Sequence, residues 1–231
     1  IVESPTSERM ANFFWAIDEL GRSHPYLPVV DGRTSTAAIY YEAFALPSGG
    51  GEGDEEWWSF DYGNAHLIGL DSSVAGWVDQ SAAQEELAWL RQDLSRAEGK
   101  LIVIFLSTPL RGSLYPSGKD ETLCSLFEPL FISSGVKAVI SGGISGYEHI
   151  YANGIHYVTT GGGGAPSLGP LGPPPSGEVF RRAGLLHYLR VTIADDAMKV
   201  EAVPVGFVED ERVQLSPTGR AIDTFVVNSS N

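Results

Sequence analysis

The chain has 231 residues, of which 43% are hydrophobic and 10% aromatic, and its formal net charge is −14. This length and apolar content are sufficient for a buried core, which excludes a disordered chain. The negative charge argues against nucleic acid and anionic membranes as main partners, and no apolar run reaches the ~18 residues of a membrane-spanning helix. A single cysteine, Cys124, allows no internal disulfide and is expected to be buried.

Helical spacing marks the start of the chain. Apolar side chains recur from Met10 to Leu20 at intervals of three and four residues. Ser4-Pro5 provides a start for this helix and Gly21 a stop, so we predict one helix. The short apolar run Tyr26–Val30 that follows predicts a strand.

A hairpin is predicted after an exposed loop. The loop is the glycine- and acid-rich stretch Ser48–Glu56. Trp57–Tyr62 and Leu67–Asp71 then flank the turn signal Gly63-Asn64. His66 lies inside this hairpin, and we interpret it as a structural histidine rather than a ligand.

The middle of the chain alternates helix and strand. Ser81–Ala97 carries an amphipathic leucine stripe and predicts a helix, and Asp120–Ser133 predicts another. Between them, the continuous apolar run Leu101–Leu106 is typical of a strand buried on both faces of a sheet.

The stretch from residue 136 to residue 164 is the most informative. Its buried strand Ala138–Ile140 ends in Ser141-Gly142-Gly143, at the carboxyl edge where open α/β sheets hold their chemistry. Asn153-Gly154 predicts a two-residue hairpin turn, and Gly161–Gly164 permits close approach of a backbone or a ligand. After the proline- and glycine-rich loop Ser167–Gly177, the further predicted strands are Leu185–Ile193, Met198–Val205 and Ala221–Val227.

The same stretch resembles the calcineurin-like metallophosphoesterases, especially their purple-acid-phosphatase-like branch. The last metal-binding loop of that family has the pattern S-G-H-x-H-x-Y-E-R, followed by N-G-x-x-Y-x-x-T-G-G-G-G-A-P. Ser141–His149 and Asn153–Pro166 match it at nearly every position except the two histidines, which are Gly143 and Ser145 here. The resemblance covers nearly the whole chain, and the other segments that match closely are Tyr40–Leu46 and Trp57–Ser72.

The resemblance implies an α/β fold, a layered sandwich of mixed β-sheets flanked by helices. It implies one domain over residues 1–231, truncated at the N-terminus relative to the family. Members of the family hold a dinuclear iron, zinc or manganese centre with histidine, aspartate and asparagine, beside a catalytic histidine. The positions of these residues that fall within this chain are Gly32, Arg33, Ser107, Gly143 and Ser145.

Glycine and serine do not hold a pair of divalent transition metals, and an arginine repels them. We therefore expect no metal cofactor and a non-catalytic domain that acts as a binding or structural module. Two enzyme alternatives stay open. One is a phosphoric ester hydrolase with residual or partner-completed activity. The other is a metal-independent serine-type hydrolase on Ser107 or Ser145, for which His149 is the nearest base in sequence.

Two further expectations concern ligands and partners. Arg33, Arg111 and His149, with the backbone of Gly142 and Gly143, could form an anion pocket, although a loop arginine such as Arg33 more often points into solvent. Loss of the family's first strands predicts an open central sheet edge, which a second copy or a partner segment would cover. We see no signal peptide in the sequence and assign no cellular location. We expect a soluble protein, which is compatible with a secreted or periplasmic location.

Overall fold

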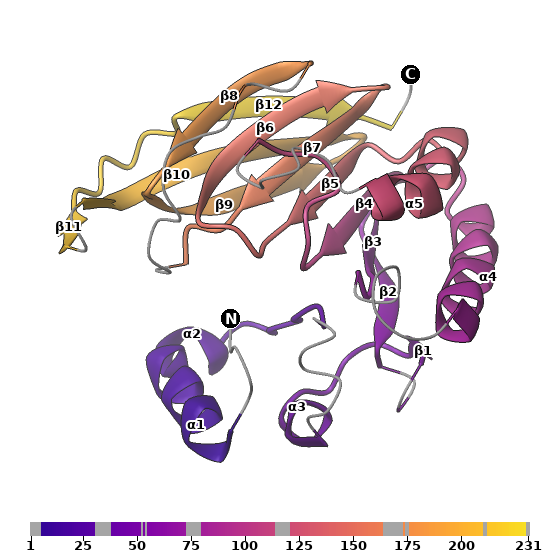
Figure 1. Cartoon of the computed structure of the whole chain (residues 1–231), viewed down its shortest axis with the longest axis horizontal. Coiled ribbons are helices and arrows are strands. Elements are labelled where there is room, and N and C mark those ends of the chain that lie inside the picture. The colour runs from indigo at the N-terminus through magenta and orange to yellow at the C-terminus, as the bar shows by residue number, and fades with distance from the viewer. Residues whose placement is uncertain are drawn as a thin grey trace.

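A computed structural model describes residues 6–30, 38–51, 53, 55–72, 80–113, 121–163, 173, 176–209 and 212–229. Within these residues the chain forms two β-sheets that pack face to face, two helices against the outer face of the larger sheet, and a group of short helices at the N-terminus (Figure 1). This is the mixed α/β sandwich that the sequence predicted.

The larger sheet has eight strands in the order β1-β2-β3-β4-β5-β7-β6-β8. Its parallel centre consists of β3 (Ala65–Gly69), β4 (Leu101–Leu106), β5 (Ala138–Ser141) and β7 (Ile155–Thr160). The antiparallel strands are β1 (Gly49–Gly50), β2 (Trp57–Tyr62), β6 (Gly146–Ala152) and β8 (Glu178–Ala183). Because parallel strands point the same way, the residues that follow β3, β4, β5 and β7 meet along one edge of the sheet.

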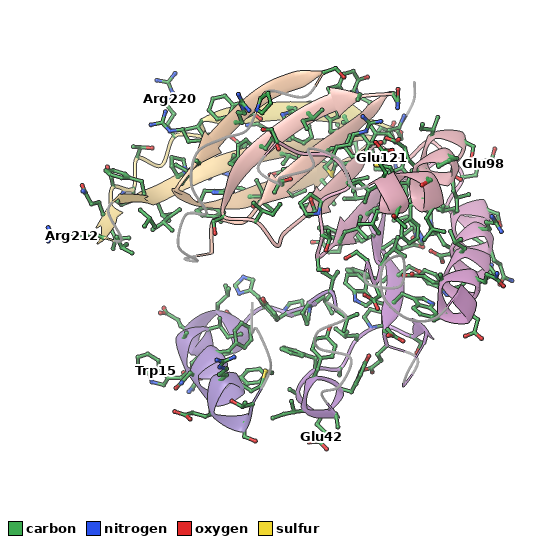
Figure 2. All side chains as sticks on the ribbon, in the orientation of Figure 1. Trp15, Glu42, Glu98, Glu121, Arg212 and Arg220 are labelled. Carbon is green, nitrogen blue, oxygen red and sulfur yellow. The ribbon has the colours of Figure 1, made fainter. Side chains whose placement is uncertain are left out.

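The smaller sheet is built on one long strand, β10 (Ala197–Glu209). β9 (Leu185–Ala194) pairs along one side of it, and β11 (Arg212–Leu215) and β12 (Asp223–Asn228) pair with it on separate stretches. The outer face carries an exposed charge ladder in which Glu201 accepts from Arg190 and Lys199, as expected of a sheet with one solvated face. The ribbon of β10 and β11 extends beyond the sandwich, with Arg212 near its tip (Figure 2).

Two apolar layers join these parts. Helices α4 (Gln80–Arg96) and α5 (Glu121–Ser133) cover one face of the larger sheet, where Leu90 and Phe127 are fully buried against β4. The other face packs on the smaller sheet through Val103, Tyr147 and residues such as Met198. Burial on both faces explains why β4 consists of apolar residues only.

Of the N-terminal helices, the first two lie apart from both sheets (Figure 1), whereas the third packs Tyr40 against Trp58 of β2. These helices are α1 (Ser7–Ala16), α2 (Asp18–Gly21) and α3 (Ala38–Ala43). Aromatic contacts of Phe13 with Tyr26 and Phe44 tie α1 to the segment around α3. Trp15 is 83% exposed and points away from the sheets (Figure 2).

Two local predictions were wrong. The predicted first helix is divided at Ile17, whose backbone leaves the helical region between α1 and α2. Tyr26–Val30 is not a strand. Its carbonyl at Pro28 accepts hydrogen bonds from Tyr40 and Trp58 side chains instead of a neighbouring strand. The predicted helix start Ser4-Pro5 and most of the loop Ser167–Gly177 lie outside the described residues.

The other predicted elements are confirmed. The hairpin after residue 56, the helices α4 and α5, the strands β4, β5, β9 and β10, and the hairpin at Asn153-Gly154 all form at or within a few residues of their expected bounds. Cys124 is buried, as expected. None of the helices within the described ranges has the length and apolarity to cross a membrane.

Candidate functional site

The carboxyl edge of the parallel strands is lined by hydroxyl groups. Ser72 follows β3, Ser107 follows β4, and Thr160 ends β7. The Oγ atoms of Ser72 and Ser107 lie 2.6 Å apart and share a hydrogen bond, and the Thr108 N–H donates to Ser72 Oγ at 3.1 Å. Ser107, one of the former ligand positions, is therefore tied to the end of the neighbouring strand.

The turn from β5 to β6 presses its backbone onto the same serine. Gly143 has a φ of +80°, and a β-carbon built there would lie 2.5 Å from the carbonyl oxygen of Ser107. Such a contact is far inside van der Waals distance, so this turn needs glycine. Ser145, two residues on, is also buried. Ser107 and Gly143, two positions that the family resemblance aligns with metal ligands, are thus in direct backbone contact.

The donor set at this edge is weak for metal ions. Hydroxyl groups and peptide carbonyls are poor ligands for iron, zinc or manganese compared with imidazole and carboxylate. Over the ranges that the structure describes, no three histidine, cysteine, aspartate or glutamate side chains form a group that could hold a metal ion. Gly32 and Arg33 lie outside those ranges.

Arg111, expected in an anion pocket, is paired inside the protein. Its Nε and Nη2 donate to both oxygens of Glu128, at 2.7 and 2.9 Å. The Tyr157 hydroxyl donates to the same carboxylate at 2.6 Å, and the guanidinium lies over the Tyr157 ring. The hydrogen bonds that Arg111 donates to Glu128 raise the pKa of Arg111. An anion would have to compete with Glu128 for this cation.

Two other members of that expected pocket, Gly142 and His149, have hydrogen-bonding partners of their own. The Gly142 N–H donates to the Leu106 carbonyl at 3.1 Å and is therefore occupied. Both ring nitrogens of His149 are engaged, Nδ1 with Asp223 and Nε2 with His156. Neither is left to act as the base that a nucleophilic Ser145 would need.

A second buried carboxylate, Glu148, orders the loop after β4. Its oxygens accept from the Ser113 N–H at 2.7 Å and from the Ser113 hydroxyl, and Arg181 donates to that hydroxyl at 2.8 Å. Glu148 has no exposed surface. No local motif indicates this network, because Ser113 and Glu148 are 35 residues apart.

The structure pairs a hydroxyl with an imidazole elsewhere at this edge. His187 Nδ1–H donates to the Leu185 carbonyl at 3.1 Å, which leaves Nε2 to accept from Thr160 Oγ1 at 3.0 Å. Burial lowers the pKa of His187, so the ring is neutral at pH 7. The pair links the two sheets. In a catalytic triad a carboxylate accepts from the histidine Nδ1–H, whereas here the acceptor is the uncharged Leu185 carbonyl, so the pair is not arranged as a triad.

His66 lies near the amino end of β3, opposite the carboxyl edge, and is held between two carboxylates. Its Nδ1 and Nε2 lie 2.8 Å from oxygens of Asp61 and Asp93. Burial works to lower the pKa of His66, but the hydrogen bonds to Asp93 and Asp61 outweigh it and raise the pKa above its ordinary value. These contacts join β2, β3 and α4, and they fit the interpretation of His66 as structural.

The fold is that of a metallophosphoesterase-like sandwich, and comparison with known proteins supports this class. No family model matches the chain. An acid phosphatase from Aspergillus ficuum is 27% identical over 164 residues, which is 54% of this chain and 26% of that protein. Purple acid phosphatase 1 of Ipomoea batatas is 26% identical, over 73% of this chain and 38% of that protein. Purple acid phosphatase 23 of Arabidopsis thaliana is 28% identical, over 90% of this chain and 39% of that protein.

Two solved structures have the same fold. One, titled "GAP50 the anchor in the inner membrane complex of Plasmodium", has a TM-score of 0.62 at 16% identity, over 98% of this chain and 86% of that chain. A purple acid phosphatase, PPD1, from yellow lupin seeds has a TM-score of 0.59 at 19% identity, over 80% of this chain and 34% of that chain.

The chain is therefore related to the purple acid phosphatases of the calcineurin-like metallophosphoesterases, which confirms the resemblance read from its motifs. It spans between 26% and 39% of the length of the three curated relatives.

Proposed function

We propose that this chain is a non-catalytic member of the metallophosphoesterase fold that serves as a binding or structural module. The observation that carries the proposal is the contact of Ser107 with Ser72 and with the backbone at Gly143. Where a dinuclear centre would need imidazole and carboxylate, these residues offer a paired hydroxyl and a glycine. A solved structure of the same fold is titled as an anchor, which supports a holding role for such a domain.

Metal analysis tests the proposal directly. The purified chain would be incubated with iron, zinc and manganese, desalted, and measured by inductively coupled plasma mass spectrometry beside a purple acid phosphatase as the positive control. We expect less than one equivalent of any of these metals per chain. Two equivalents per chain would overturn the proposal and favour a phosphoric ester hydrolase.

Activity measurements address the two enzyme alternatives. We expect no hydrolysis of p-nitrophenyl phosphate or of p-nitrophenyl acetate above the rate with heat-unfolded protein. Phosphatase activity that needs added metal would support the residual hydrolase. Esterase activity that is lost in Ser107→Ala, Ser145→Ala or Thr160→Val would support the metal-independent hydrolase, and the variant that loses it would identify the nucleophile.

The same proposal includes a partner that pairs with an open sheet edge. Within the described residues β12 pairs with β10 alone, and its run from Thr224 to Asn228 carries no charge that would prevent further pairing. Val226 is 53% exposed on this strand. In solution scattering we expect an assembly larger than one chain, reduced by Val226→Lys. A monodisperse wild-type monomer would count against this partner.

A further inference from the structure

A chain of hydrogen bonds runs from β12 into the larger sheet. Asp223 Oδ2 accepts from the Tyr147 hydroxyl and from His149 Nδ1, both at 2.7 Å. His149 Nε2 faces His156 Nδ1 at 2.8 Å. Asp223 comes from β12, His149 from β6 and His156 from β7, so this chain joins the smaller sheet to the larger one.

The two imidazoles are also packed against an aromatic side chain of β12. The ring of Phe225 lies 4.3 Å from the rings of both His149 and His156, and it is within 7° of parallel to His156. Tyr151 contacts His156 at 4.6 Å. His149 is 1% exposed, whereas His156 is partly exposed. Solvent protons therefore have access to the pair through His156.

The facing nitrogens set a limit on the protons that the pair can hold. In the neutral pair, His156 Nδ1–H donates to His149 Nε2, and His149 Nδ1–H donates to Asp223. One added proton fits, because His149 can then donate from both nitrogens while His156 accepts at Nδ1 and carries its own proton on Nε2. A second added proton places two N–H groups against each other at 2.8 Å and puts two positive charges side by side.

We propose that this histidine pair is an acid-operated release for β12. When both imidazoles are charged, the bond between them is lost, the stack on Phe225 opens, and β12 loses its contacts with β6 and β7 and frays from β10, its partner strand in the smaller sheet. The rest of the larger sheet keeps its structure, because its buried strands do not depend on this contact. The inference does not rest on the function proposed above.

The surroundings of His156 disfavour its protonated form, as the proposed release requires. Burial and the nearby His149 lower the pKa of His156 to about 4, and the Asp223 carboxylate opposes them. The other titratable side chains that the structure places against the pair are Tyr147 and Tyr151. Lys137 contacts His156 through its backbone carbonyl, and the residue opposite His149 on β8 is the uncharged Phe180.

The sign of the effect follows from that pKa. An unfolded or released His156 binds its proton near pH 6.5, well above the pKa that it has in place. The contribution of the contact is therefore complete above about pH 6.5 and is lost as the pH falls towards 4.

Hydrogen–deuterium exchange at pH 6.5 and pH 4.0, corrected for intrinsic rates, tests the release. In the wild type we expect residues 223–228 to exchange roughly tenfold faster at pH 4.0, while residues 101–106 of β4 stay protected. In His156→Gln, whose amide can still donate to His149 and takes up no proton, we expect no such change. His24→Gln, at an exposed histidine, is the control and should behave as the wild type.

Each contrary result is distinct. Unchanged exchange of β12, equal acceleration in His156→Gln, or simultaneous loss of protection in β4 would each overturn the proposal, the last because it signals global unfolding. If His156→Gln does not fold, the ring signals of the wild type decide by NMR titration: a second imidazole that protonates near pH 4 supports the release, and two independent titrations near pH 6.5 exclude it.

Discussion

Gly143 and Ser107 are in backbone contact at the carboxyl edge of the larger sheet, so close that a β-carbon on Gly143 would lie 2.5 Å from the Ser107 carbonyl oxygen. In the resembled family, both positions carry ligand histidines. Here the φ of +80° at Gly143 and the Ser72–Ser107 hydrogen bond make a turn that leaves no room for a side chain at Gly143. A histidine placed at Gly143 would therefore meet the Ser107 carbonyl oxygen in this turn.

The first prediction concerns that contact. Gly143→Ala should lower the free energy of unfolding by roughly 1–3 kcal/mol, since it combines an unfavourable φ with a steric overlap. Gly142→Ala is the matched control, because its β-carbon would lie 4.0 Å from the same carbonyl oxygen and its φ is not in the left-handed region. Urea unfolding measures both. Equal effects of the two substitutions would contradict this account of the turn.

The second prediction concerns the ion pair of Arg111 and Glu128. Glu128→Ala leaves the partly buried Arg111 guanidinium and the Tyr157 hydroxyl without their acceptor and should lower stability by roughly 1–3 kcal/mol. The pair of Arg190 and Glu201 on the solvated face serves for comparison, and Arg190→Met should have a much smaller effect. Thermal unfolding of both variants tests this. A small effect of Glu128→Ala would show Arg111 free to serve an anion pocket.

Local pattern was enough to predict most of the sandwich. The apolar run of β4, the leucine stripe of α4 and the Asn153-Gly154 turn each specify their structure within one short segment. The pattern failed at Tyr26–Val30, where Pro25 and Pro28 remove two backbone donors, so the apolar side chains are buried without strand pairing.

The side-chain networks could not be predicted in this way. His149 meets Asp223 from 74 residues away, and Thr160 meets His187 from 27. Such partners depend on the register of two sheets against each other, which no local spacing encodes. Motif comparison could identify the former ligand positions at Ser107 and Gly143, but not that they touch, because that contact is made by backbone atoms.

The third prediction is a pH dependence at His66. The hydrogen bonds to Asp93 and Asp61 raise the pKa of His66 above 6.5 in the folded protein. Its contribution to stability is therefore complete below about pH 6.5 and is lost as the pH rises through the raised pKa. The difference in stability between wild type and His66→Gln, from urea unfolding, should shrink between pH 6 and pH 9. A difference that grows with pH would show that His66 is neutral in the folded state.

The fourth prediction separates packing from ligand binding in the glycine run after β7. A β-carbon on Gly161 would lie 1.6 Å from the carbonyl oxygen of Ile144, whereas one on Gly163 would have no neighbour within 4 Å. Gly161→Ala should therefore destabilise the protein by roughly 3 kcal/mol or more, and Gly163→Ala should have an effect within about 0.5 kcal/mol. Urea unfolding of the two variants gives the comparison. If Gly161 is the sensitive position, the run exists to let the β5–β6 turn approach β7. If Gly163→Ala were instead the more destabilising change, Gly163 would have to contact another group in solution. That result would support a role of the glycine run in ligand binding.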